Sequence, residues 1–134
     1  MACNHTIHKH NYHFGWDNSI EPNLSVSPGQ SVEIETIDSS GGQLNARSTL
    51  NDLSSLSFDK VNPVTGPIYI EGAKPGDAVA VTFLDFQPSG WGWTANIPGF
   101  GLLADQFTVP ALHIWKYDSF SMKPALHGPG GKVP

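Results

Sequence analysis

Two carboxylates in this sequence come directly after strand-forming runs. Asp38 ends the alternating segment Ser31–Asp38 and shares one strand face with Val32 and Ile34. A carboxylate on a core-facing side is costly unless it is paired, hydrogen-bonded or bound to a metal. Asp38 therefore either caps the Ser-Ser-Gly-Gly turn that follows it, through backbone N–H groups, or belongs to a polar site.

Glu71 is the second of these carboxylates. It stands between the apolar run Ile68–Ile70 and a Gly-Ala-Lys-Pro-Gly turn, and by alternation it shares a face with Tyr69. That face is either solvent, which would make Glu71 an ordinary polar strand end, or the wall of a site. Asp85 and Asp105 raise the same question more weakly.

Histidines form the other group able to do chemistry. His5, His8, His10 and His13 lie within nine positions and could bind a metal, with His10 and His13 as the more specific candidates. The alternative is that they are solvated or packing residues on a mobile N-terminal segment. Asp17, in Trp-Asp-Asn-Ser-Ile, either makes a turn into the first strand or faces a pocket.

Several familiar catalytic patterns are absent from the sequence. It contains no Gly-x-Ser-x-Gly, no phosphate-binding loop and no His-Glu-x-x-His. Cys3, the single cysteine, excludes an internal disulfide and lies too near the terminus to be a strong nucleophile candidate. Residue types and spacing alone therefore predict an acidic, aromatic-lined β domain with a possible site, and they name no reaction.

Composition limits the class of protein. The 134 residues suit one domain, and 14 Gly and 11 Pro with only 14% charged residues are typical of a β protein with many turns. The net charge of −5, without a Lys/Arg run, argues against nucleic acid as a partner. No run is long enough to cross a membrane and no secretory h-region is visible, so we expect no membrane partner and a cytoplasmic location.

The elements that must position these residues are mostly strands. We expect strands at 31–38, 68–70, 78–86 and 112–117, a weaker one at 24–26, and one short helix at 46–56. Pro-Gly turns precede two of the strands, and residues 87–101 predict a long Gly/Pro/Trp loop. The fold class expected is all-β, with one β-sandwich or jelly-roll-like domain over 1–134 and little helix. We expect this domain to be an incomplete part of a larger β-rich fold.

Four blocks of the sequence together resemble the acetamidase/formamidase family. They read HFGWDNSIEP, PGQSVEIETIDSSGGQL, VNPVTGPIYIEGAKPGD and PGFGLLADQF, in the family's order, and the resemblance runs from about His10 to Pro134. It implies hydrolysis of a small aliphatic amide, such as formamide or acetamide, to ammonia and the carboxylate. It also implies a sandwich-type β fold, oligomeric assembly and, for some members, a divalent metal.

The chain departs from the family in length. Members are about twice as long, and their second half carries a Gly-rich acidic block with a histidine that has no counterpart in this sequence. The chain therefore resembles the family's N-terminal half. A fragment of a longer protein, a two-chain enzyme and a remnant without activity all remain as alternatives, and we expect self-association or association with the missing half.

The resemblance also selects candidate site residues. The acidic and amide positions that match are Glu35, Asp38, Gln43, Asn62, Glu71 and Asp105. We hypothesise that Asp38 and Glu71 are catalytic, holding a divalent metal such as Zn²⁺ or Ca²⁺ or activating water. Gln43 and Asn62 would orient the substrate, and no organic cofactor is expected.

Two tryptophans complete the candidate site and also support competing functions. Trp91 and Trp93 would form an apolar lid that limits the substrate to a few atoms. An exposed Trp-Gly-Trp loop on a β-sandwich is equally typical of a carbohydrate-binding module, in which the aromatics stack on sugar and the acids hold Ca²⁺. A subunit interface is the third alternative, because aromatic residues are enriched there.

Overall fold

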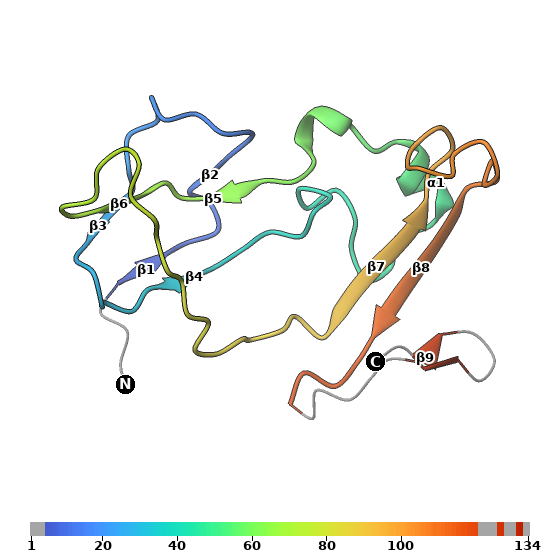
Figure 1. Cartoon of the computed structure of the whole chain (residues 1–134). Coiled ribbons are helices and arrows are strands. Elements are labelled where there is room, and N and C mark those ends of the chain that lie inside the picture. Colours follow the sequence, from blue (N-terminus) through green and yellow to red (C-terminus); the bar gives the residue numbers. More distant parts are fainter. Residues whose placement is uncertain (1–4, 121–125, 128–130, 133–134) are drawn as a thin grey trace. The chain divides into compact units, whose positions relative to one another are not determined.

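The computed structural model describes residues 5–120, 126–127 and 131–132 (Figure 1). Strands outnumber helices throughout this part of the chain, so the expected all-β class is confirmed. The residues cluster into two compact units, one formed by residues 1–42 and 57–82 and the other by residues 43–56 and 83–134. No helix among the described residues has the length and apolar character required to cross a bilayer.

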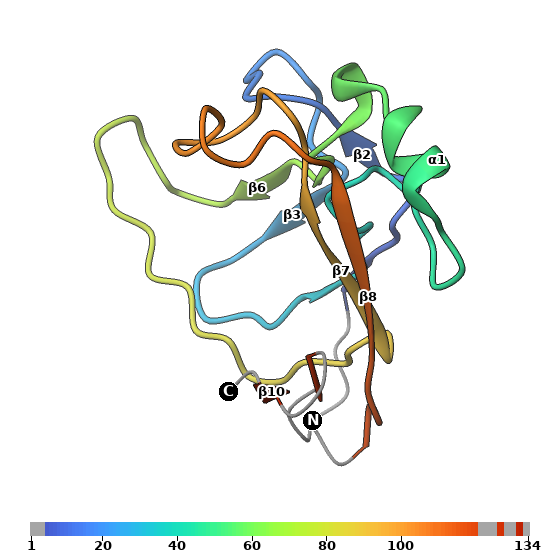
Figure 2. The same ribbon diagram turned by 90° about the vertical axis from the view of Figure 1, so that its right-hand side faces the viewer.

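Two parallel strand pairs form the framework of the first unit. Strand β1 (Thr6–Ile7) pairs with β4 (Glu33–Ile34), and β3 (Leu24–Val26) pairs with β6 (Ile68–Ile70). The register of the second pair sets Leu24 opposite Ile68, so the two strands advance together along their whole length (Figure 2). The predicted strands at 24–26 and 68–70 are thereby confirmed residue for residue.

A third pair and a short 3₁₀ turn complete this unit. Strand β2 (Tyr12–His13) runs antiparallel to β5 (Val64–Thr65), and η1 (Phe58–Lys60) leads into β5. Every sheet among the described residues has only two strands. Each strand therefore keeps one edge without a strand neighbour in the described part of the chain.

The second unit is built on one long hairpin. Strand β7 (Trp91–Asn96) runs antiparallel to β8 (Ala111–Lys116), and the indole N–H of Trp115 donates to the Thr94 hydroxyl at 2.8 Å. Strands β9 (Leu126–His127) and β10 (Gly131–Lys132) form a second, much shorter antiparallel pair.

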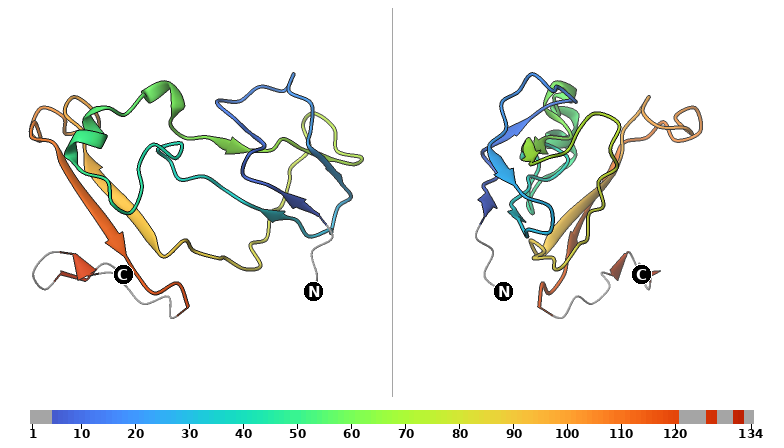
Figure 3. Two further views of the ribbon diagram at one scale, coloured as in Figure 1. Left: turned by 180° about the vertical axis from the view of Figure 1, so that it is seen from behind. Right: turned by 60° about the vertical axis from the view of Figure 1, so that its left-hand side comes forward.

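The helix α1 (Leu50–Ser54) contacts β8 within this unit (Figure 3). It is shorter than the predicted segment 46–56 because an Asn45-centred turn precedes it, with the Ser48 N–H donating to the Asn45 carbonyl at 3.0 Å. The Asp52 carboxylate accepts the Thr49 N–H at 2.7 Å, which satisfies a backbone donor at the helix start and sets where α1 begins.

Each unit has a small apolar core. Among the described residues, the buried apolar side chains are Ile7 and Val26 in the first unit and Leu44 and Leu53 in the second. Ser40, in the first unit, is the buried polar residue among those described. Short strands that pair two by two leave most apolar side chains only half covered.

The two Pro-Gly turns are confirmed. In each, the backbone N–H of the residue after Gly donates to the carbonyl three residues earlier, Gln30 to Ser27 at 3.1 Å and Asp77 to Lys74 at 3.0 Å. Gly29 and Gly76 both have positive φ, as a type II turn requires. Both Pro-Gly segments therefore form the same type of turn.

Two strand predictions need correction. Residues 31–38 form a strand only at β4, where β1 provides a partner. Residues 78–86 form no strand, and Val81, Phe83 and Leu84 are more than 70% exposed. A run that is apolar on both faces becomes a central strand only when neighbours cover it, and no strand in the described residues lies beside it.

The prediction of a loop at 87–101 was also wrong for six of these residues. Trp91–Asn96 is β7, because Trp91, Trp93 and Ala95 alternate with smaller or polar residues and find β8 as a partner. The frequent Gly and Pro on either side concealed this alternation. The long connection between the strands is instead the stretch from 97 to 110.

Gly41 offers a test of this fold. A Cβ at this residue would collide with the Lys60 carbonyl oxygen, and its φ of +71° disfavours any side chain. Gly72 has a similar φ of +79° but open space around its Cβ position. We predict that Gly72→Ala lowers the free energy of unfolding by about 1 kcal/mol, from strain alone, and that Gly41→Ala lowers it by about 3 kcal/mol or more. Urea unfolding followed by circular dichroism measures both, and equal losses would show that the contact between residues 41 and 60 is not formed.

Candidate functional site

Glu71 lies at the end of β6 and is held by the neighbouring strand. Its backbone N–H donates to the Val26 carbonyl at 2.8 Å, which continues the β3–β6 pairing by one residue. Its carboxylate accepts the Ser27 hydroxyl at 2.6 Å and the Ser25 hydroxyl at 3.2 Å. Two serines at alternate positions thus face one carboxylate, which is exposed to solvent and oriented by both hydroxyls.

Asp38 caps its own turn. Its carboxylate accepts the Ser40 N–H at 2.9 Å and the Gly42 N–H at 3.0 Å, and its carbonyl accepts the Gly41 N–H at 2.9 Å. The turn-capping alternative drawn from the sequence is therefore confirmed. These bonds engage both carboxylate oxygens in holding the backbone, while the catalytic role of Asp38 stays a prediction.

Asn62 is brought to the Asp38 turn by a backbone contact. Its N–H donates to the Ser39 carbonyl at 2.8 Å, and it has a φ of +54°, which asparagine tolerates better than most residues. Asp38 and Asn62 therefore belong to one local structure. The hydrogen-bond partners of Glu71 lie elsewhere, on β3 and at Ser27 directly after it.

The other predicted site residues lie in the second unit. Gln43 is half-buried beside the fully buried Leu44. Trp91 and Trp93 are half-buried on β7, where they pair with Lys116 and Ile114 of β8. Both tryptophans belong to a regular strand, and their role against a substrate stays a prediction.

Side chains that could bind a metal do not gather in the described part of the chain. Over 5–120, 126–127 and 131–132, no group of three or more His, Cys, Asp or Glu side chains is arranged to hold a metal ion. His8 instead lies 3.4 Å from the Glu35 carboxylate and stacks on His10, with ring centroids 5.7 Å apart. His13 has a buried Nδ1 without a hydrogen-bond partner. The residues described here thus do not fit a three-ligand metal site.

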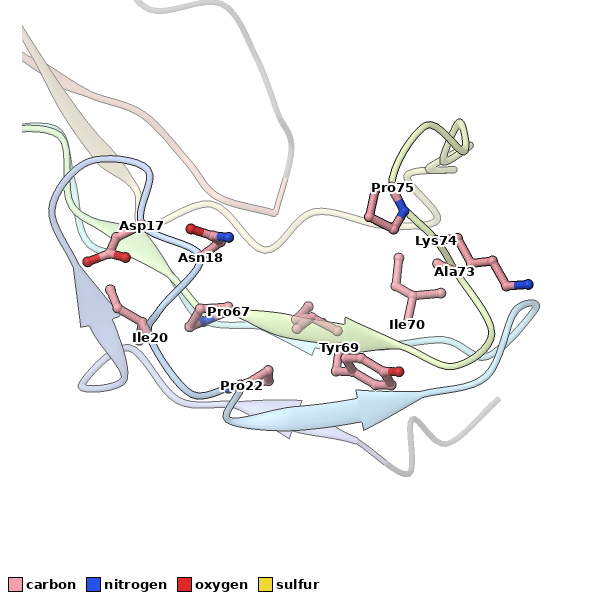
Figure 4. A pocket seen from close by; sticks show the side chains of 11 residues that line it. Asp17, Asn18, Ile20, Pro22, Pro67, Tyr69, Ile70, Ala73, Lys74 and Pro75 are labelled. Atoms are coloured by element: carbon pink, nitrogen blue, oxygen red, sulfur yellow. The ribbon is translucent and has the colours of Figure 1, made fainter.

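A pocket of about 510 Å³ lies along β6 (Figure 4). Its walls come from two of the blocks that carry the family resemblance, the segment after β2 and the segment around β6. The lining residues are Asp17, Asn18, Ile20, Pro22, Pro67, Ile68, Tyr69, Ile70, Ala73, Lys74 and Pro75. The pocket is therefore mainly apolar, with polar groups near its two ends.

Asp17 lines one end of this pocket. The sequence had left open whether Asp17 makes a turn or faces a pocket. Its Oδ1 accepts the Ser19 hydroxyl at 2.6 Å and the Ser19 N–H at 2.8 Å. These two hydrogen bonds lower the pKa of Asp17 below its usual 3.8, and nearby His13 adds to the effect. Asp17 is therefore a fixed negative charge at neutral pH.

Sequence reasoning missed the two serines that hold Glu71 and the pocket residues Asn18 and Lys74. Alternation in Leu-Ser-Val-Ser already placed Ser25 and Ser27 on one face. What the sequence did not reveal was the parallel pairing of β3 with β6, which depends on partners more than 40 residues apart.

Comparison with known proteins first places the chain among β-rich proteins described as amidases. It aligns with the crystal structure of an acetamidase from Bacillus halodurans at a TM-score of 0.83 and 28% identity, covering 96% of this chain and 42% of that one. A recombinant predicted acetamidase/formamidase from Thermoanaerobacter tengcongensis aligns with the same TM-score at 25% identity, again over 42% of its length.

The family assignment follows from the sequence match. The profile of the Acetamidase/Formamidase family matches residues 2–131, so the chain belongs to this family. It is 33% identical over 111 residues to a formamidase of Methylophilus methylotrophus, covering 78% of this chain and 27% of that protein. It is 30% identical over 118 residues to an acetamidase of Mycolicibacterium smegmatis, covering 78% and 29%. The chain thus spans less than a third of the length of these two relatives.

The Ser19 contacts predict a measurable shift at the pocket. Ser19→Ala removes the hydroxyl donor, so the pKa of Asp17 should rise toward 3.8, whereas Ser25→Ala should leave it unchanged. Because the folded-state pKa is lowered, the stabilisation that Asp17 contributes is present above the unfolded pKa and is lost as pH falls through the folded pKa. Carboxyl ¹³C shifts titrated by NMR measure the change, and an identical titration in Ser19→Ala would contradict this account.

Proposed function

We propose that this chain contributes to the hydrolysis of a small aliphatic amide, formamide or acetamide, to ammonia and the carboxylate. The observation that carries the proposal is the family match over residues 2–131, together with relatives named formamidase and acetamidase. Because the chain spans only part of these relatives, the activity of a whole enzyme is itself part of the proposal.

The reaction sets clear chemical requirements. Water adds to the amide carbon as a base removes its proton, the carbonyl oxygen carries the developing negative charge, and the nitrogen must gain a proton before the C–N bond breaks and ammonia leaves. A site therefore needs a group, such as a carboxylate, that can accept and return a proton, together with hydrogen-bond donors and acceptors that orient the amide.

Glu71 is the residue of this chain that we assign to proton transfer. Its carboxylate is exposed and is oriented by hydroxyls rather than by a cation, so it keeps lone pairs for water. Ser25 and Ser27 act as positioning residues, because their hydrogen bonds hold the carboxylate in one orientation. A carboxylate fixed in this way needs no reorganisation when a proton is transferred.

Asp38 is assigned a positioning role. Its carboxylate shapes the turn that lies beside Asn62, and we propose that Asn62 orients the substrate's carbonyl or amide group. The substrate-binding roles of Gln43, Trp91 and Trp93, which belong to the second unit, stay predictions from the sequence. A divalent metal enters no step of this proposal, because the described donor set does not fit one.

The carbohydrate-binding alternative is not favoured. It required Trp91 and Trp93 on an exposed loop, whereas both are half-buried on β7. The named relatives and solved structures are amidases or amidase-like proteins.

The proposal is tested by ammonia release from formamide and acetamide by the purified chain, with and without added Zn²⁺ or Ca²⁺. We expect Glu71→Gln to lower kcat by about 100-fold or more, the usual contribution of a general base. Glu21→Gln removes an exposed carboxylate elsewhere in the same unit and should leave kcat unchanged. Full activity in Glu71→Gln would exclude the assigned base, and a folded wild-type chain that releases no ammonia would exclude activity in this chain alone.

Asp38→Asn separates positioning from proton transfer. The amide keeps one acceptor oxygen but replaces the other with a donor, so one of the two turn hydrogen bonds is lost. We expect a loss of about 1–3 kcal/mol in the free energy of unfolding and an unchanged pH profile of kcat. A changed pH profile with full stability would instead make Asp38 the proton-transfer residue.

A further inference from the structure

The shorter of the two hydroxyl contacts of Glu71 comes from Ser27. The Ser27 hydroxyl donates to Oε2 of Glu71 at 2.6 Å, and the Ser25 hydroxyl donates to Oε1 at 3.2 Å. A hydroxyl within hydrogen-bond reach of a base, with a third group orienting that base, is the arrangement that activates a nucleophile. Ser27 has the position of the nucleophile, Glu71 that of the base, and Ser25 that of the orienting group.

The backbone of Ser27 is held on both sides of its side chain. Its N–H donates to the side-chain oxygen of Gln30 at 2.7 Å, and its carbonyl accepts the Gln30 N–H at 3.1 Å. Where β3 lies beside β6 (Figure 2), the preceding residue, Val26, accepts the Glu71 N–H at 2.8 Å. The hydroxyl and the carboxylate are therefore fixed against each other, which lowers the entropic part of a reaction barrier.

Two other hydroxyl–carboxylate contacts in the chain have a different character. Ser19 donates to Asp17 at 2.6 Å, and Thr49 donates to Asp52 at 3.0 Å. In each, the carboxylate also accepts the backbone N–H of the same residue, and these hydrogen bonds lower the pKa of both aspartates. A carboxylate with a lowered pKa is a weaker base. The donors of Glu71 instead lie 44 and 46 residues away, outside its own turn.

We propose that Ser27 is a covalent nucleophile and that Glu71 is its general base. The Ser27 Oγ bonds to the carbonyl carbon of the amide as Glu71 takes the hydroxyl proton, and the carbonyl oxygen carries the negative charge. Glu71 then returns the proton to the nitrogen, the C–N bond breaks, and ammonia leaves an acyl ester on Ser27. This inference rests on the proposed amide hydrolysis and makes Ser27, instead of water, the group that attacks first.

Water enters at the second step and uses the same base. It adds to the ester carbon as Glu71 takes one of its protons, the bond from carbon to Oγ breaks, and Oγ regains the proton while the carboxylic acid leaves. The two steps together consume one amide and one water and release one acid and one ammonia. Splitting one difficult substitution into two easier ones is what a covalent intermediate contributes. Direct attack by water on the amide forms no such intermediate.

Labelling with an alkyl fluorophosphonate tests the nucleophile without using the amide reaction. This reagent bonds to an activated serine oxygen and loses fluoride, and peptide mass spectrometry locates the adduct. We expect the adduct on Ser27, and we expect Glu71→Gln to slow its formation about 100-fold, the usual contribution of a general base. Ser19 is the matched control within the same chain, because its hydroxyl lies at the same 2.6 Å from a carboxylate.

The result is read on the wild-type chain and so does not depend on the folding of a serine variant. Labelling of Ser19 as fast as Ser27, or a labelling rate that Glu71→Gln leaves unchanged, overturns the proposal. Glu21→Gln, at an exposed carboxylate elsewhere in the same unit, should leave the labelling rate at the wild-type value.

Ammonia release measured on the same samples separates this inference from the proposed function. Labelled Ser27 without ammonia release supports the nucleophile and removes amide hydrolysis from this chain alone. Ammonia release without labelling of Ser27 leaves direct attack by water and overturns the nucleophile, as does a folded Ser27→Ala variant with the wild-type kcat. The absence of both labelling and ammonia release overturns both.

Discussion

The parallel pairing of β3 with β6 is the contact on which the position of the Glu71 carboxylate depends. It joins segments more than 40 residues apart and brings the hydroxyls of Ser25 and Ser27 to the Glu71 carboxylate. Two contacts reinforce the entrance to the pair, the Asn23 side-chain amide donating to the Gly66 carbonyl at 2.7 Å and the Asn23 N–H donating to the Pro67 carbonyl. A parallel pair is slightly less stable per residue than an antiparallel one, so these flanking bonds matter.

This pairing also explains how the site could be anticipated in part. The strands at 24–26 and 68–70 followed from local preference, and Glu71 was singled out because a charge beside an apolar run needs a reason. The serines whose hydroxyls hold this charge lie elsewhere, Ser25 on β3 and Ser27 directly after it. Choosing β3 as the partner of β6 needs information on pairing that alternation within one segment does not contain.

The failures of sequence reasoning have the same origin. Residues 78–86 have strong strand preference, but preference produces a strand only where a neighbour accepts its hydrogen bonds. Trp91–Asn96 shows the reverse case, because a stretch between Gly and Pro residues became regular once β8 lay beside it. The capping role of Asp38 could be predicted from the sequence, because the hydrogen bonds of a Ser-Ser-Gly-Gly turn involve only neighbouring residues.

The small cores of the two units affect how the chain responds to heat and denaturant. In the part of the chain that the structure describes, only two apolar side chains are buried in each unit, while Val81, Phe83 and Leu84 are largely exposed in the folded state. Unfolding therefore uncovers little additional apolar surface, and both the heat-capacity increment and the slope of stability against urea scale with that surface. The chain should accordingly unfold over a broad interval, with a flat stability curve that has neither a pronounced maximum nor a marked loss of stability on cooling.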